Sequence, residues 1–160
     1  MTEAQLKLAE SLADIFIPAD QVSAAASVAN AADFIDEWVS APYPDQVSDR
    51  ELILSGLEDI EKRARRRFKA SFIDLEINEK TVLVDELTPM FGFLPAYLDT
   101  KSFFSRFRYL VVSAFYLSDE GMQDLGYLGN QPIVGPYPGP TEEALAHLQV
   151  VLDKLGLKMP

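Results

Sequence analysis

Residues 48–68 read SDRELILSGLEDIEKRARRRF, and this stretch decides the fold class. Its apolar side chains recur every three or four residues, a spacing that places them on one face of an α-helix. The stripe consists of Ile53, Leu57, Ile60, Ala64 and Phe68. Ser48 with Glu51 three residues later is typical of a capping box, so we expect this helix to begin at Ser48.

The rest of the chain also predicts helices. Helical patterns run from Thr2 to Phe16, after an Asn30 cap, from Ile77 to Leu87, from Asp99 or Thr100 to Phe115, and after a Thr141 cap. The run Thr81-Val82-Leu83-Val84 is β-prone and leaves a strand open there. We therefore predict an all-α, compact bundle of about five or six helices with long ordered Gly/Pro-rich loops. We expect a single domain over residues 1–160.

One segment cannot follow the helical period. Residues 126–140 read GYLGNQPIVGPYPGP and contain four of the eight glycines and four of the ten prolines. Proline lacks an amide donor and glycine costs entropy in a helix, so we expect a shaped loop. The stretch from Pro136 to Pro140 predicts a rigid extended strip that presents Tyr137. Such a strip suits an interface, although packing against the chain's own helices is an equal alternative.

The composition excludes several classes of function. The net charge of −11 argues against nucleic acid or an anionic membrane as the partner. No window approaches the ~20 apolar residues of a membrane span. The chain has no cysteine and one histidine, so a transition-metal site is not expected. No export signal is recognised in the sequence as written, which predicts a cytoplasmic location, or a periplasmic one if a twin-arginine signal was removed or the partner carries one.

Candidate catalytic groups are few. His147 lacks a nucleophile in its pattern, so we interpret it as a surface histidine. Carboxylates cluster on both sides of the Gly/Pro loop, at Asp119, Glu120, Asp124, Glu142 and Glu143. They fit helix ends better than an acid–base pair, because carboxylates there complement the helix dipole. The basic run from Arg63 to Lys69 is interpreted as a solvated helix end, with a docking patch as the alternative.

Four segments in order resemble the gluconate 2-dehydrogenase subunit 3 family. They are the run from Asp14 to Asp20 (DIFIPAD), the run from Ala32 to Asp36 (ADFID), the run from Arg63 to Phe68 (RARRRF) with Phe72 beyond it, and the loop end from Gly135 to Pro140 (GPYPGP). The resemblance covers about residues 6–140 and leaves a helix at 141–156 as a C-terminal extension. The chain departs from the family pattern in lacking the twin-arginine signal, in a shorter glycine loop and in this added helix.

The resemblance implies a non-catalytic small subunit. Family members bind, stabilise and help mature the large subunit of flavin-dependent sugar or polyol dehydrogenases of the glucose–methanol–choline class, and many co-export it. FAD would therefore lie in the partner, with no cofactor, metal or catalytic residue in this chain. The resemblance also allows a cytochrome subunit as a further partner. The sugar, the electron acceptor and the stoichiometry stay open.

We expect the partner interface to use aromatic segments of the chain. The residues are Phe91, Phe93, Tyr97, Phe103, Phe104, Phe107, Tyr127, Tyr137 and Pro138. The helix from Phe103 to Phe115 is apolar over more than one face, which is typical of a helix in the core or shared between core and partner. Two alternatives remain: a stand-alone helical adaptor without a flavoenzyme partner, and a cofactor-free enzyme that uses the carboxylates near the loop.

Overall fold

The computed structural model describes residues 1–87, 98–127, 129, 134–136 and 138–158. Every regular element in these ranges is helical, which confirms the all-α prediction. The β-prone run at 81–84 lies inside a helix. The elements are α1 (Glu3–Phe16), α2 (Ala31–Ser40), α3 (Pro44–Phe68), the 3-10 turn η1 (Phe72–Asp74), α4 (Ile77–Leu87), α5 (Leu98–Leu117), α6 (Asp119–Asp124) and α7 (Glu142–Leu155).

The chain divides into two compact units, Met1–Tyr127 and Leu128–Pro160. This differs from the single domain expected over residues 1–160. The first unit holds α1 to α6 around one hydrophobic core, whose buried side chains come from α1 to α5, η1, the loop before α2 and Leu75 before α4. The second unit holds α7, on which no residue is buried.

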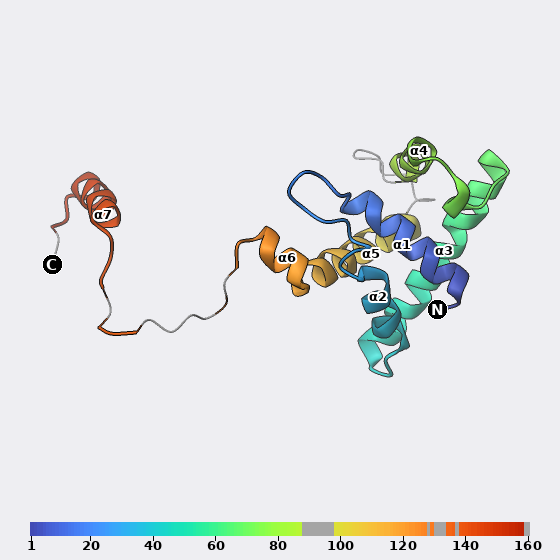
Figure 1. Cartoon of the computed structure of the whole chain (residues 1–160), viewed down its shortest axis with the longest axis horizontal. Coiled ribbons are helices and arrows are strands. Elements are labelled where there is room, and N and C mark those ends of the chain that lie inside the picture. The colour runs from blue at the N-terminus through green and yellow to red at the C-terminus, as the bar shows by residue number, and fades with distance from the viewer. Residues whose placement is uncertain (88–97, 128, 130–133, 137, 159–160) are drawn as a thin grey trace. The chain divides into compact units, whose positions relative to one another are not determined.

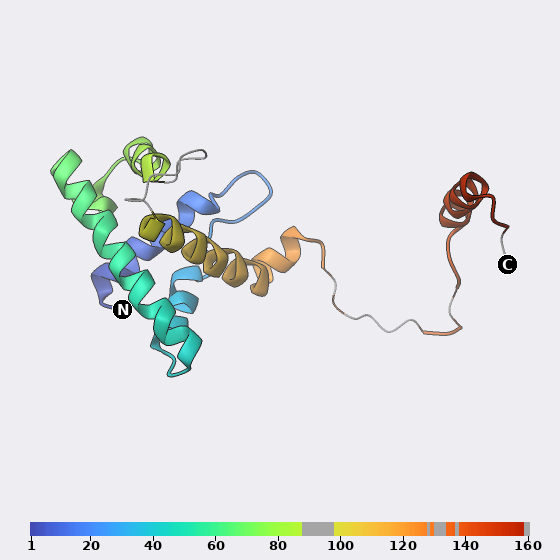
Figure 2. The ribbon, with the colours of Figure 1, turned by 180° about the vertical axis from the view of Figure 1, so that it is seen from behind.

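In the first unit, α5 is the central helix. It packs against α1, α2, α3 and α6. Figure 1 shows α1 and α2 in front of α5, and Figure 2, from behind, shows α5 in front of α1 and α2. One side of α5 therefore faces the core and the other faces away from it.

The long helix α3 has the predicted stripe but a different start. Ile53, Leu57, Ile60 and Ala64 are all at most 1% exposed. The helix begins at Pro44, with Tyr43 as the N-cap residue, so the predicted start at Ser48 is wrong. The fixed backbone angle of proline suits the first helical position, and the Ser48 hydroxyl instead donates to the Asp45 carbonyl at 2.8 Å.

Two helix caps test the sequence interpretation further. Thr2 and Gln5 form a complete capping box at the start of α1. Asn30 precedes α2 as predicted, but its side chain makes no capping bond, because the residue adopts a left-handed conformation with φ 52°. That conformation lets the chain turn sharply into α2, so Asn30 acts through its backbone.

Carboxylates organise the loop between α1 and α2. Asp20 accepts hydrogen bonds from the backbone N–H groups of Val22 and Ser23, both at 2.7 Å, and these bonds lower its pKa. Asp14 accepts one from the Ser27 N–H at 2.8 Å. Both acids of the DIFIPAD run therefore satisfy backbone donors in a segment without regular structure. Their role there is structural.

The end of α3 is fixed in a similar way. Glu61 accepts from the Phe72 N–H at 2.9 Å and from the Ser71 hydroxyl at 3.1 Å. Arg65 donates to the same carboxylate at 2.6 Å. These bonds hold η1 against α3 and bury Phe72 completely.

Candidate partner-binding surface

The inner face of α5 belongs to the chain's own core. Phe103, Phe104 and Phe107 are 2%, 4% and 0% exposed. The ring centroids are 5.1 Å apart for Phe103 and Phe104 and 5.5 Å apart for Phe103 and Phe107. Phe16 of α1 packs on the rings of Phe104 and Phe107. Because no surface remains on these rings for a partner, their assignment to the interface is corrected: they support α5 from within.

The same helix has an open side. Tyr109, Val112 and Tyr116 are 58%, 39% and 40% exposed. Successive residues of an α-helix are rotated by about 100° about its axis, which places Tyr109, Val112 and Tyr116 on one stripe with Ser105, which is also exposed. Arg106 and Arg108 lie along the two opposite edges of this stripe. We call these six residues, Ser105, Arg106, Arg108, Tyr109, Val112 and Tyr116, the outer face of α5.

The outer face of α5 was not among the predicted interface residues, although the sequence contains a signal for it. Tyr109, Val112 and Tyr116 follow the positions i, i+3 and i+7, which repeat on one helix face. The phenylalanines of the same helix follow a second stripe on the opposite side. Two apolar stripes on one helix indicate that it is shared between a core and another surface, and the more hydrophobic stripe is the one that the core takes.

Arg106 is held in place by a neighbouring carboxylate. Its Nε lies 2.8 Å from Asp49 Oδ1 of α3, and its Nη2 also donates to Asp49 Oδ2. Trp38 of α2 donates its indole N–H to Asp49 Oδ2 at 2.8 Å. The guanidinium carbon lies 5.5 Å from the Trp38 ring centroid and 5.0 Å from that of Tyr109. We call Trp38, Asp49 and Arg106 the brace, since they join α2, α3 and α5.

Asp49 is the one buried charged residue among those described, at 8% exposed. Burial raises the pKa of this carboxyl, but the hydrogen bonds from Arg106 and Trp38 and the charge of Arg106 outweigh burial, so the pKa lies below its ordinary value. Asp49 is therefore ionised and paired at neutral pH. A fixed ion pair of this kind positions the Arg106 and Tyr109 side chains at low entropic cost.

The end of the first unit adds further exposed apolar side chains. Leu117, Leu125 and Tyr127 are 70%, 63% and 58% exposed. After α6, Gly126 has a φ of 63° and the Tyr127 N–H donates to the Met122 carbonyl at 2.9 Å. This is a Schellman cap, so Gly126 ends a helix rather than opening the loop. Tyr127, one of the predicted interface residues, lies on the surface.

The remaining five predicted interface residues fall outside the described part of the first unit. Phe91, Phe93, Tyr97 and Tyr137 lie outside the described residues. Pro138 is exposed and belongs to the second unit. In that unit, Gly129, Gly135 and Gly139 all have positive φ angles, between 73° and 110°, which explains why glycine occupies these turns.

The predicted carboxylates sit at helix ends. Asp119 and Glu120 occupy the first turn of α6, and Glu142 and Glu143 that of α7. Asp124 accepts a hydrogen bond from the Ser23 hydroxyl, which ties α6 to the loop before α2. His147 lies exposed on α7. The arginines 63, 65 and 67 form ion pairs with Asp59, Glu61 and Glu86.

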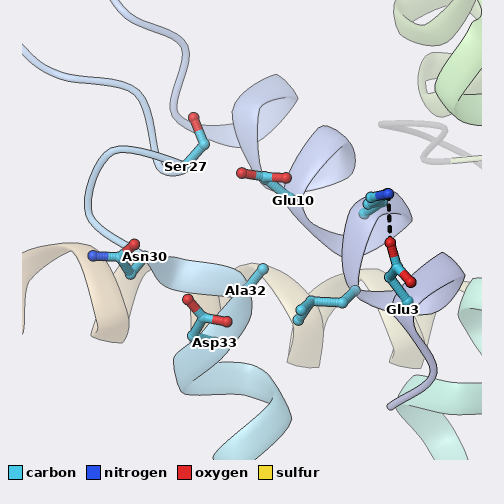
Figure 3. A pocket seen from close by; sticks show the side chains of 8 residues that line it. Glu3, Glu10, Ser27, Asn30, Ala32 and Asp33 are labelled. Carbon is cyan, nitrogen blue, oxygen red and sulfur yellow. Dashed lines mark hydrogen bonds and ion pairs between the residues drawn. The ribbon is translucent and has the colours of Figure 1, made fainter.

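A shallow cavity of about 240 Å³ lies between α1 and α2 (Figure 3). Its described lining consists of Glu3, Leu6, Lys7, Glu10, Ser27, Asn30, Ala32 and Asp33. Glu3 pairs with Lys7 at 2.7 Å, and this hydrogen bond lowers the pKa of Glu3 and raises that of Lys7. The cavity is smaller than the ~300–1,000 Å³ of typical ligand sites, and its charges face water. This geometry supplies no acid–base pair.

The described residues contain no group of three or more acidic, histidine or cysteine side chains that could hold a metal ion. None of their helices combines the length and the apolar character needed to cross a membrane.

Comparison with known proteins gives one match. A sequence model of the family described as Gluconate 2-dehydrogenase subunit 3 matches residues 3–139. The match spans all of the first unit except its first two residues and ends before α7. No curated protein and no solved structure matches the chain.

Proposed function

Because this chain belongs to the gluconate 2-dehydrogenase subunit 3 family, we propose that it is the non-catalytic small subunit of an FAD-dependent sugar or polyol dehydrogenase. The family match over residues 3–139 is the observation that carries this proposal. In the proposed complex, a large subunit of the glucose–methanol–choline class binds FAD and oxidises the substrate. This chain binds and stabilises the large subunit and helps it mature. If the large subunit is exported, this chain accompanies it.

The geometry of the first unit supports a binding role. The outer face of α5 presents two tyrosines and a valine beside a fixed arginine, and tyrosine and arginine are enriched at protein interfaces. A permanent interface buries on the order of 2,000 Å² or more, so further surface must contribute. Leu117, Leu125 and Tyr127 are exposed residues of the same unit and extend the available apolar area.

The physical effect on the partner is mass action. A small subunit that binds only the folded large subunit removes it from the unfolding equilibrium, and the stabilisation grows with the concentration of the small subunit. It also covers apolar surface that would otherwise promote association of the large subunit with itself.

Expression of the large flavoprotein with and without this chain tests the proposal. We expect more soluble, FAD-loaded large subunit when the chain is present, and a higher thermal midpoint for the complex than for the large subunit alone. Equal yield, flavin content and thermal midpoint in both cultures would contradict a stabilising role. An adjacent gene for a large chain with an N-terminal dinucleotide-binding glycine motif identifies the partner to express.

A further inference from the structure

The outer face of α5 differs in charge from the rest of the protein. The chain has 25 Asp and Glu residues and 14 Lys and Arg, yet residues 100–117 of α5 contain no carboxylate. The exposed apolar stripe of Tyr109, Val112 and Tyr116 is bordered by arginines on both edges. In a protein of net charge −11, this helix face is locally positive.

The two arginines differ in how they are used. Arg106 is neutralised by Asp49 in the brace. Arg108 is exposed, and among the residues that the structure describes none forms an ion pair with it. A guanidinium prefers a bidentate carboxylate or phosphate, so among the described residues Arg108 is a donor without an anionic acceptor.

We propose that the outer face of α5 docks the large subunit through a patch in which at least one carboxylate pairs with Arg108 and apolar side chains cover Tyr109, Val112 and Tyr116. This inference rests on the proposed function and specifies its surface. The brace keeps the face rigid before binding, because Arg106 is bonded to Asp49 and lies against the Tyr109 ring.

Charge selects this occupant over a symmetric homodimer through the same face. A symmetric homodimer through the same face would oppose two stripes that both lack carboxylates and both carry Arg108. Like charges across an interface are unfavourable, whereas an acidic patch on a different protein is complementary. A tyrosine hydroxyl can hydrogen-bond to a polar group of the partner while its ring is covered by apolar side chains.

Matched substitutions test the surface. Arg108→Glu and Val112→Asp change the outer face, and Arg66→Glu on α3 and Val82→Asp on α4 are their controls. Arg66 is likewise exposed, with no ion pair to a described residue, and Val82 is 43% exposed against 39% for Val112. The assay measures the dissociation constant of each full-length variant for the purified FAD-loaded large subunit, at low and high salt. Circular dichroism checks that each variant is folded.

We expect both outer-face variants to bind on the order of tenfold or more weakly, and both controls to bind as the unsubstituted chain does. Raising the salt concentration should weaken the unsubstituted complex more than the Arg108→Glu complex. If the unsubstituted chain binds and all four variants bind equally, the surface assignment is overturned while the subunit role stands. If the unsubstituted chain does not bind the flavoprotein, both proposals are overturned. A homodimer that Arg108→Glu dissociates would also overturn the assignment.

Discussion

Arg106 and Asp49 lie 57 positions apart in the sequence and form a bidentate ion pair between α5 and α3, in which Nε and Oδ1 are 2.8 Å apart. This pair fixes the helix that carries both the largest aromatic cluster of the core and the outer face. The stability of the fold and the shape of the proposed interface therefore depend on the same contact.

Removing the arginine should destabilise the fold. We expect Arg106→Met to lower the free energy of unfolding by about 2–3 kcal/mol, less than the ~3–5 kcal/mol for a fully buried pair, because the Arg106 side chain is 30% exposed. Urea unfolding of Arg106→Met, Asp49→Asn and the double variant gives the coupling energy. A coupling near zero would show that the two residues act independently. Arg66→Met is the control and should change stability by less than about 0.5 kcal/mol.

Acid should weaken the fold through two carboxylates. Burial raises the pKa values of Asp49 and Glu61, but hydrogen bonds and a nearby arginine lower them by more. Both pKa values therefore lie below the ordinary values of 3.8 and 4.5. A lowered folded-state pKa stabilises the protein above the unfolded-state value, and that contribution is lost as the pH falls through the folded-state pKa. The free energy of unfolding should therefore fall as the pH drops below about 5. Asp49→Asn should make this dependence shallower; an unchanged slope would contradict the assignment.

A side chain at Gly56 should destabilise the fold. A Cβ at this position of α3 would lie 2.0 Å from the Phe103 ring of α5. Helix propensity alone favours alanine by about 1 kcal/mol, whereas overpacking a core costs about 1–3 kcal/mol. We expect Gly56→Ala to lower stability by about 1 kcal/mol, measured by thermal unfolding. The same change in a Phe103→Leu background should cost less. If Gly56→Ala stabilises the protein with Phe103 present, the close approach of α3 and α5 is contradicted.

Removal of α7 should leave the first unit folded. All buried side chains of the described residues lie in Met1–Tyr127, and the family match ends at residue 139. We expect deletion of residues 141–160 to change the free energy of unfolding of the first unit by less than about 0.5 kcal/mol. Denaturant unfolding followed by the single tryptophan, Trp38, reports on this unit. A loss of several kcal/mol would show that α7 contributes to its core.

The sequence predicted the helices well because their apolar spacing and caps are local signals. The stripe from Ile53 to Ala64, the capping box at Thr2 and the start of α7 after Thr141 all depend on residues within one or two turns. The start of α3 was misplaced because two motifs competed, and proline at the first helical position outweighed the Ser48–Glu51 box.

The site was harder to predict because it depends on which of two apolar faces the core takes. Phe103, Phe104 and Phe107 are large apolar residues of α5, and that property made them candidates for an interface as well as for the core. The contact between Asp49 and Arg106 brings together residues from different helices, and no local pattern indicates it. The spacing of residues in the sequence predicts which side chains share a face of one helix. It does not predict which other helix that face contacts, because tertiary packing decides this.

The central claim is that this chain acts by binding a flavoprotein rather than by catalysis. The most direct measurement is affinity purification of the full-length chain co-expressed with the large subunit, followed by flavin absorbance and dehydrogenase assay of the complex and of the chain alone. The account predicts a stable yellow complex that holds all of the activity and an inactive, colourless isolated chain. Purification of the chain without any flavoprotein, or turnover by the isolated chain, would contradict it.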